Sequence, residues 1–149
     1  MSKRWGVPTW YFFHTFAEKI TTNLFQTKRE ECLNIIESIC SSLPCPYCKD
    51  HARNYLKTHN FDSIKTKEEL KMFLFKFHND VNRRKKQKIE SENILEQYSR
   101  VNMVNALKYF RQEFFRNYFV ANHFSGWVRN ILLEKLINFF KKNISSFHP

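Results

Sequence analysis

The chain has 149 residues and a formal net charge of +11, with sixteen phenylalanines but only two glycines and four prolines. This composition excludes low-complexity and collagen-like chains, and it predicts one compact domain, or a domain with a helical extension, around an aromatic-rich core. Four cysteines are too few for a secreted disulfide scaffold, and no run approaches the roughly 20 apolar residues of a membrane span.

The spacing of apolar residues is helical along nearly the whole chain and predicts an all-α fold. The first helix is expected from about Pro8 to Thr22. Thr27 and Glu30 have the capping-box pattern of a second helix, which ends before Pro44. Its inward face carries Cys32, Leu33, Ile36, Ile39 and Cys40, and we expect both of these cysteines to be buried.

A third, short helix is expected to begin at the cysteine pair in LPCPYCKD and to run through Tyr55. Thr66 and Glu69 repeat the capping-box pattern and open a fourth helix, from Leu70 through Val81 and onward. Strong β patterns are absent from the sequence. A thioredoxin-like fold is therefore not expected, because that fold alternates strands and helices around its CxxC motif.

Cys45 and Cys48 stand two residues apart where the third helix begins. Two thiols at this spacing can close a disulfide ring, and a helix N-terminus lowers the pKa of a cysteine by favouring the thiolate. Pro44 and Pro46 flank Cys45 and remove two backbone donors, so we expect an exposed, restrained turn. The pair predicts a redox-active dithiol.

A second polar cluster lies in the fourth helix, where FHNDVNRR places His78, Asn79 and Asn82 on one side. Imidazole and amide groups at the edge of a bundle suit a flat heteroaromatic ligand with many hydrogen-bonding edges. Trp10 and His14, four residues apart in the first helix, would supply a stacking wall and a polar contact. The basic run that follows, RRKKQK, suits a pyrophosphate.

Together, the segments WGVPTWYFFHTFA, LPCPYCKDHARNYL and FHNDVNRR resemble, in order and separation, the Erv/ALR family of FAD-dependent sulfhydryl oxidases over roughly residues 5 to 90. The resemblance implies a four-helix bundle with a short fifth helix, which holds FAD beside the CxxC disulfide. The LPCPxC pattern followed by His and Ala is most similar to the short members encoded by large cytoplasmic DNA viruses. This implies a viral protein of the host cytoplasm or the virion.

The resemblance also implies roles for individual residues. Cys45 would face the substrate thiol and Cys48 the flavin. The residues that it places at the FAD are Gly6, Trp10, His14, His51, His78, Asn79, Asn82, Arg83 and Lys85. Two features differ from cellular relatives: Phe75 replaces a helix cysteine that joins a disulfide there, and Lys-Pro does not follow the VN motif. The residue that contacts the pyrophosphate is therefore left open.

The predicted function is thiol oxidation, in which electrons pass from the dithiol to FAD and then to oxygen, giving hydrogen peroxide. We expect a thiol-containing protein substrate, a CxxC relay protein, and a homodimer, but no nucleic-acid partner. The alternative is a non-enzymatic helical module that binds nucleic acid or zinc. Cys45, Cys48, His51 and His59 can be drawn as zinc ligands, although the two histidines are eight residues apart, outside the usual spacing.

Residues 1–90 are predicted to form the FAD-binding bundle and residues 91–149 a helical extension. A helical pattern runs from Ser91 to Asn105, and the segments YFRQEFFRNYF and GWVRNILLEKLINFF carry more apolar side chains than a lone solvated helix exposes. We expect the extension to pack across the bundle and to form part of a dimer interface or a dock for a substrate protein. It contains no cysteine, so we expect no redox chemistry in it.

Overall fold

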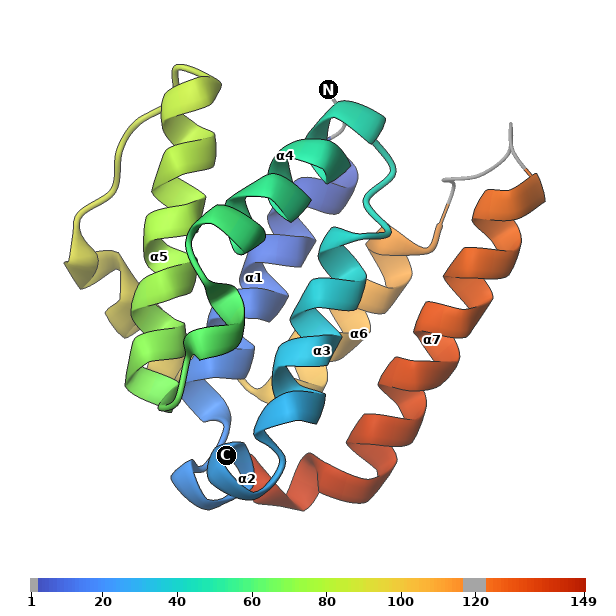
Figure 1. The fold of residues 1–149 in the computed structure, drawn as a ribbon. Helices are drawn as coiled ribbons and strands as arrows, with labels where there is room; N and C mark the ends of the chain where they lie inside the picture. Colours follow the sequence, from blue (N-terminus) through green and yellow to red (C-terminus); the bar gives the residue numbers. More distant parts are fainter. Residues whose placement is uncertain (1–2, 117–122) are drawn as a thin grey trace.

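The computed structural model describes residues 3–116 and 123–149 (Figure 1). These residues fold into seven α-helices: α1 (Lys3–Lys19), α2 (Thr22–Thr27), α3 (Arg29–Cys40), α4 (Pro46–Thr58), α5 (Lys67–Arg84), α6 (Met103–Phe114) and α7 (His123–Asn143). Three 3-10 helices join or follow them: η1 (Phe61–Ser63), η2 (Glu92–Arg100) and η3 (Ile144–Ser146). The described residues form no strand, so the all-α prediction is confirmed.

The helix α1 lies at the centre of the fold (Figure 1). It packs against α5 and α6, while α3 contacts α4 and α7. The first turns of α1 and α4 and the last turns of α3, α5 and α6 lie toward the same end of the molecule, the upper one in Figure 1. Side chains from five helices can therefore converge there.

The first helix begins and ends earlier than predicted: the sequence pattern extended it to about Thr22, whereas α1 ends at Lys19 and Thr22 begins α2. α1 starts at Lys3 and contains Pro8, which the sequence pattern placed near the first turn. Proline lacks an N–H group, so the helix loses one hydrogen bond there, the one to the carbonyl of Arg4. That loss falls in the second turn and does not end the helix.

The predicted capping box at Thr27 and Glu30 is wrong. Thr27 is the last residue of an additional short helix, α2, and its hydroxyl donates to the carbonyls of Asn23 and Leu24. α3 begins at Arg29, and Lys28 at its N-cap makes no side-chain capping bond. The local pattern resembled a helix start because it lies at the junction of two helices.

The other helix predictions for the first ninety residues are confirmed. The five residues expected on the inward face of α3 are all buried. Cys45 is the N-cap of α4, with Pro46 in the first turn. Thr66 and Glu69 form a reciprocal capping box at the start of α5.

The extension differs from the single helical pattern predicted from Ser91 to Asn105. The structure has the 3-10 helix η2 there, a break at Val101 and Asn102, and then α6. The side chain of Asn102 caps α6 by accepting a hydrogen bond from the backbone N–H of Asn105. Residues 117–119, the end of YFRQEFFRNYF, lie outside the described residues.

Phenylalanine side chains join the extension to α1. Phe12 stacks on Phe110 of α6 with ring centroids 4.9 Å apart, and it meets Phe140 of α7 edge-on at 6.0 Å. Phe16 contacts Phe139, also of α7, at 6.0 Å. These side chains belong to one hydrophobic core, so the extension does pack across the bundle. The boundary near residue 90 between two domains stays a proposal.

Residues 146–149 are hydrogen-bonded to the segment at the end of α1. The Lys19 ammonium is buried and donates to the carbonyls of Ser99 and Pro149, while the N–H of Thr21 donates to the carbonyl of Ser146.

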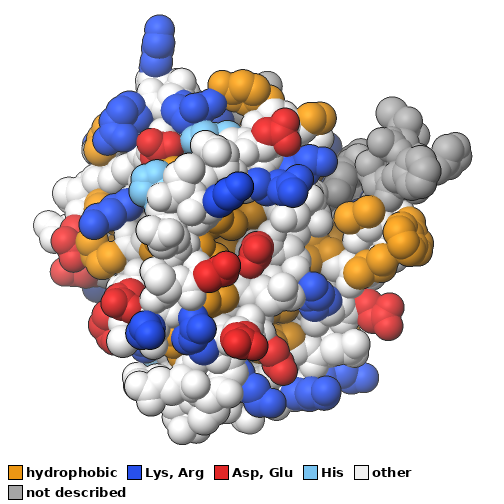
Figure 2. Space-filling model, viewed as in Figure 1, with side chains coloured by type: hydrophobic (Ala, Val, Ile, Leu, Met, Phe, Trp, Pro, Cys, Tyr) orange, Lys and Arg blue, Asp and Glu red, His pale blue; other side chains and the backbone are white. Residues whose placement is uncertain are grey.

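No helix within residues 3–116 and 123–149 has the length and apolar character needed to cross a membrane. Figure 2 shows Lys and Arg side chains over the visible face, several of them toward the upper end.

Candidate active site

The dithiol lies at the first turn of α4. The Cys45 sulfur caps this turn by accepting a hydrogen bond from the backbone N–H of Cys48 at 3.2 Å. Both cysteines are thiols here and both are partly buried. This capping bond holds the Cys45 sulfur over the turn that carries Cys48.

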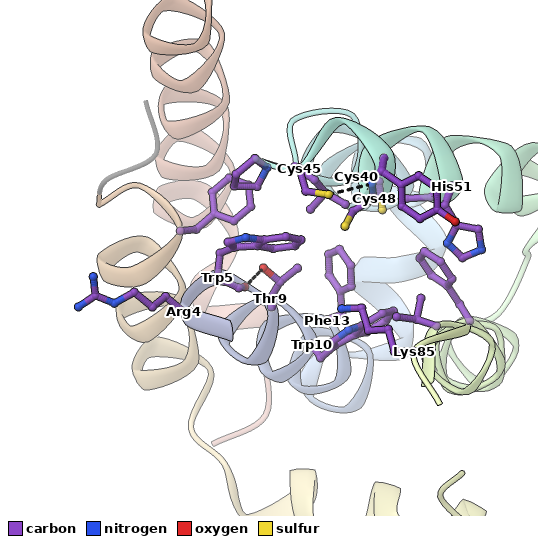
Figure 3. Close-up of a pocket in the computed structure, with 18 of the residues that line it drawn as sticks. Arg4, Trp5, Thr9, Trp10, Phe13, Cys40, Cys45, Cys48, His51 and Lys85 are labelled. Carbon is purple, nitrogen blue, oxygen red and sulfur yellow. Dashed lines mark hydrogen bonds between the residues drawn. The ribbon is translucent and has the colours of Figure 1, made fainter. Parts of the chain in front are cut away.

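A cavity of about 530 Å³ opens beside the dithiol. Figure 3 shows Cys40, Cys45 and Cys48 along one side of it, across from Trp5 and Thr9 of α1. The aromatic part of its wall consists of Trp5, Trp10, Phe13, Tyr47, Phe77 and Phe114. Its basic side chains are Arg4, Arg84, Lys85 and Arg116. An apolar cavity with a few charged groups is the usual form of a small-molecule site.

The electrostatics at Cys48 differ from the expected effect of a helix N-terminus. Burial and, to a smaller extent, the adjacent Cys45 raise the pKa of Cys48 to about 11, while Lys85 acts in the opposite direction. Desolvation of the thiolate therefore outweighs the helix terminus in the reduced pair. A thiolate at Cys48 depends on a positive charge brought close to it, and Lys85 is placed to supply part of that charge.

His51 faces an acidic partner across the α4–α5 interface. Its Nε2 lies 3.0 Å from Oδ2 of Asp80, whose other oxygen is 3.8 Å from Arg83. Burial and the nearby Arg84 lower the pKa of His51, and Asp80 opposes them. Because Asp80 fixes one ring nitrogen, it sets the orientation of the imidazole at the cavity wall.

An aromatic stack extends behind the cavity wall. Trp10 lies parallel to His78 with ring centroids 4.1 Å apart, and Nε2 of His14 is 2.9 Å from Nδ1 of His78. The ring of Tyr98 also contacts His14, with ring centroids 4.9 Å apart. The α1–α5 interface thus holds a hydrogen-bonded histidine pair directly behind one of the rings that line the cavity.

The two asparagines of FHNDVNRR bind the segment that follows α5. The Asn79 amide donates to the carbonyl of Glu90 at 2.9 Å and accepts from its N–H at 3.0 Å. Asn82 donates to the Asn79 side-chain oxygen at 3.4 Å. These bonds fold the link between α5 and η2 back onto the helix.

The sequence profile of the Erv1/Alr family matches residues 7–102, which include most of α1, the dithiol and all of α5. The chain belongs to this family. It is similar to proteins named FAD-linked sulfhydryl oxidase from two isolates of African swine fever virus. One is 32% identical over 114 residues, covering 74% of this chain and 92% of the relative, and the other is 34% identical over 97 residues, covering 62% and 81%.

A relative from Invertebrate iridescent virus 3 is 32% identical over 98 residues, which cover 64% of this chain and 66% of the relative. No solved structure matches the chain significantly. The family match and the viral relatives agree with the resemblance that the three sequence motifs carried.

The Erv1/Alr motifs are brought together only in part at the cavity. Its lining includes the predicted residues Gly6, Trp10, Cys45, Cys48, His51 and Lys85. His14 and His78 lie behind Trp10, while Asn79, Asn82 and Arg83 do not line the cavity. Their assignment to FAD therefore stays a prediction.

Several lining residues were missed at the sequence level. Trp5 and Tyr47 adjoin predicted residues within WGVPTW and CPYC, so the motifs contained a signal for both. Cys40 was predicted as a core cysteine; it is buried, and it also lines the cavity. Phe114 and Arg116 come from the extension, where no Erv1/Alr motif pointed to the site.

The zinc alternative has no geometric support in the described part of this Erv1/Alr chain. No group of three or more His, Cys, Asp or Glu side chains within residues 3–116 and 123–149 is arranged to hold a metal ion. His59 stacks on Tyr55, with ring centroids 3.8 Å apart, and its Nδ1 lies 3.0 Å from the Tyr55 carbonyl oxygen.

The buried histidine pair predicts that stability falls in mild acid. Burial, reinforced by His78, lowers the pKa of His14 to about 3, and burial, reinforced by Lys85, lowers that of His78 to about 4. The unfolded chain protonates these groups near their usual pKa of about 6.5, so below that pH it binds more protons than the folded chain. As the pH falls from about 6 to about 4, we expect each histidine to lower the free energy of unfolding by up to about 1.4 kcal/mol per pH unit.

Urea unfolding at a series of pH values measures this slope. His78→Asn should remove about half of this dependence of the free energy of unfolding on pH. The control is His148→Asn, which alters an exposed histidine and should leave the dependence unchanged. A free energy of unfolding that does not change between neutral and mildly acidic pH would contradict the prediction.

Proposed function

We propose that this chain is a FAD-linked sulfhydryl oxidase that forms disulfide bonds in protein substrates. The observation that carries the proposal is the dithiol of Cys45 and Cys48 at the wall of an aromatic cavity, in a chain of the Erv1/Alr family. Relatives of this chain carry that activity in their names. A flavin-linked thiol oxidase needs a CxxC pair to accept electrons from the substrate and a cavity lined by planar side chains to hold the flavin beside it.

The residues around the cavity fit a flavin. Trp5 and Trp10 offer flat apolar surfaces, and the space beside Gly6 is open, since a Cβ added there would meet no atom within 4 Å. Lys85 brings positive charge to the same cavity, which suits a phosphate-bearing ligand. The cavity volume of about 530 Å³ lies within the usual range for small-molecule sites.

Gly6, Trp10, His51 and Lys85 would hold FAD directly, since they line the cavity. His14 and His78 would support Trp10 from behind and stay neutral at physiological pH. For Asn79, Asn82 and Arg83, contact with FAD remains part of the proposal. It would require Asn79 to exchange its bonds to Glu90, and Asn82 its bond to Asn79, for bonds to the cofactor.

The protein's own chemistry is thiol–disulfide exchange. A substrate thiolate attacks the Cys45 sulfur of the Cys45–Cys48 disulfide, and the S–S bond breaks with its electron pair on Cys48. The second substrate thiolate then displaces Cys45, so the substrate leaves as a disulfide and the enzyme pair is reduced. Lys85 stabilises the negative charge that develops on Cys48. When bound, FAD accepts the electron pair of the reduced dithiol and passes it to oxygen, giving hydrogen peroxide.

The partners follow from this chemistry. The substrate is a protein with two neighbouring thiols, a CxxC relay protein, and oxygen is the final acceptor. We further propose a homodimer that uses the extension, and a site of action in the host cytoplasm or the virion, as suits relatives encoded by viruses.

Purification of the full chain tests the function. We expect a yellow protein with a flavin absorbance spectrum that consumes oxygen and releases hydrogen peroxide when dithiothreitol is added. The alternative, a non-enzymatic zinc or nucleic-acid module, predicts a colourless protein without thiol-dependent oxygen consumption. That result would contradict the proposed oxidase function.

A further inference from the structure

We propose that Tyr47 and Arg84 form a substrate platform beside the dithiol, which binds polypeptide cysteine pairs flanked by acidic side chains. This inference rests on the proposed oxidase function and names the class of its substrate. The platform consists of these two residues, one from the first turn of α4 and one from the last turn of α5.

Tyr47 stands between the two cysteines and is 71% exposed, the largest exposed fraction among the large apolar and aromatic side chains of the described residues. A ring in this position adds little to the core. Exposed aromatic side chains are characteristic of binding surfaces, because they supply contact area at a low entropic cost. Cys45 and Tyr47 belong to one turn and line one cavity, so a polypeptide thiol that reaches Cys45 approaches the turn that carries this ring.

Arg84 holds the ring in place. Its guanidinium carbon lies 5.3 Å from the ring centroid of Tyr47, and it donates a hydrogen bond to the phenolic oxygen at 2.5 Å. Both side chains line the cavity that the cysteines line. An exposed ring that is already fixed loses less conformational freedom when a substrate binds, so the platform is preorganised.

The charge around the platform favours an acidic partner. Arg4, Arg84 and Lys85 line the cavity, whereas Glu113 is the acidic side chain in the described lining and is paired with Arg116 at 3.2 Å. The nearby Asp80 is bound to His51. The visible face in Figure 2 also carries Lys and Arg side chains toward its upper end.

Positive charge also assists the exchange reaction. The nucleophile is the substrate thiolate, and the leaving group is the Cys48 thiolate, so both charged species form close to Arg84 and Lys85. Acidic side chains beside the substrate cysteines raise the pKa of those thiols in free solution, and the basic platform would offset this effect at the point of contact. The same charges thus serve recognition and reaction.

Two synthetic peptides with one shared Cys-x-x-Cys pair, flanked by glutamates or by lysines, test the platform on the full-length flavoprotein. We expect kcat/KM for the glutamate peptide to exceed that for the lysine peptide by about tenfold or more at low ionic strength. The ratio should shrink as salt is added. Equal values for the two peptides would overturn the platform. Failure to oxidise dithiothreitol as well would overturn the proposed function instead.

Arg84→Gln should lower the glutamate-to-lysine ratio of kcat/KM several-fold, and Tyr47→Ala should lower both peptide values relative to dithiothreitol. Lys108→Gln removes the same charge from an exposed position on α6 that does not line the cavity, and it should leave the ratio unchanged. Because the readout is a ratio measured on one preparation, differences in flavin content or folding cancel. An Arg84→Gln enzyme with the ratio of Lys108→Gln would show that the platform is wrong.

Discussion

Cys48→Ser is expected to abolish flavin reduction by thiols, with a loss of about three orders of magnitude or more, as is typical when a residue that forms a covalent intermediate is removed. Without Cys48, Cys45 cannot form the intramolecular disulfide that a substrate thiolate attacks, so the exchange reaction has no acceptor and no electrons reach the flavin. Anaerobic addition of dithiothreitol, followed by the flavin's visible absorbance, measures this step directly.

Cys45→Ser should fail differently. It is expected to retain bound FAD and to lose disulfide exchange with protein substrates, because we propose Cys45 as the sulfur that the substrate thiolate attacks. Cys32→Ser is the matched control, since this cysteine is buried in α3 and does not line the cavity. Near-normal oxygen consumption by both active-site variants would rule out the dithiol mechanism.

Phe110→Ala is expected to lower the free energy of unfolding by about 3 to 5 kcal/mol. Phe110 is fully buried, stacks on Phe12 of α1 at 4.9 Å and stacks on Phe114 at 4.7 Å. Its removal leaves a cavity between the extension and the central helix, which rigid neighbours fill only in part. Chemical denaturation followed by circular dichroism measures the loss.

Gln112→Ala, an exposed position on the same helix, should be nearly neutral. The shape of the transition also tests the proposed domain boundary. If residues 91–149 form a separate unit, Phe110→Ala should split unfolding into two steps, whereas a shared core predicts one weakened step. An unchanged midpoint would contradict the packing of α6 on α1.

The helices were predictable where local chemistry determines them. The capping box of Thr66 and Glu69 requires only four consecutive residues, and Pro46 after Cys45 marks a helix start without any tertiary contact. The extra helix α2 was missed because Thr27 fits a helix end as well as a helix start. The break before α6 was missed because apolar spacing does not distinguish a 3-10 helix from an α-helix over nine residues.

The site residues that lie close together within one sequence motif were predictable. Cys48 and His51 lie in α4 and Cys45 is its N-cap, so their spacing brings all three to one wall. Pairings across helices left no such local signal: Asp80 with His51, Arg84 with Tyr47, and His14 with His78 join residues 29, 37 and 64 positions apart. The raised pKa of Cys48 could not be predicted from the sequence either, because its main cause is burial, which depends on the packed fold.

The contribution of Phe114 and Arg116 to the cavity wall has a consequence for the order of synthesis. A ribosome releases a chain from its N-terminus, so α1, α4 and α5 emerge before α6 exists. All three Erv1/Alr motifs can then be present and helical while one wall of the cavity is still inside the exit tunnel. A nascent chain at that stage has the dithiol but an open pocket, and its cofactor can be enclosed only after translation has passed residue 116.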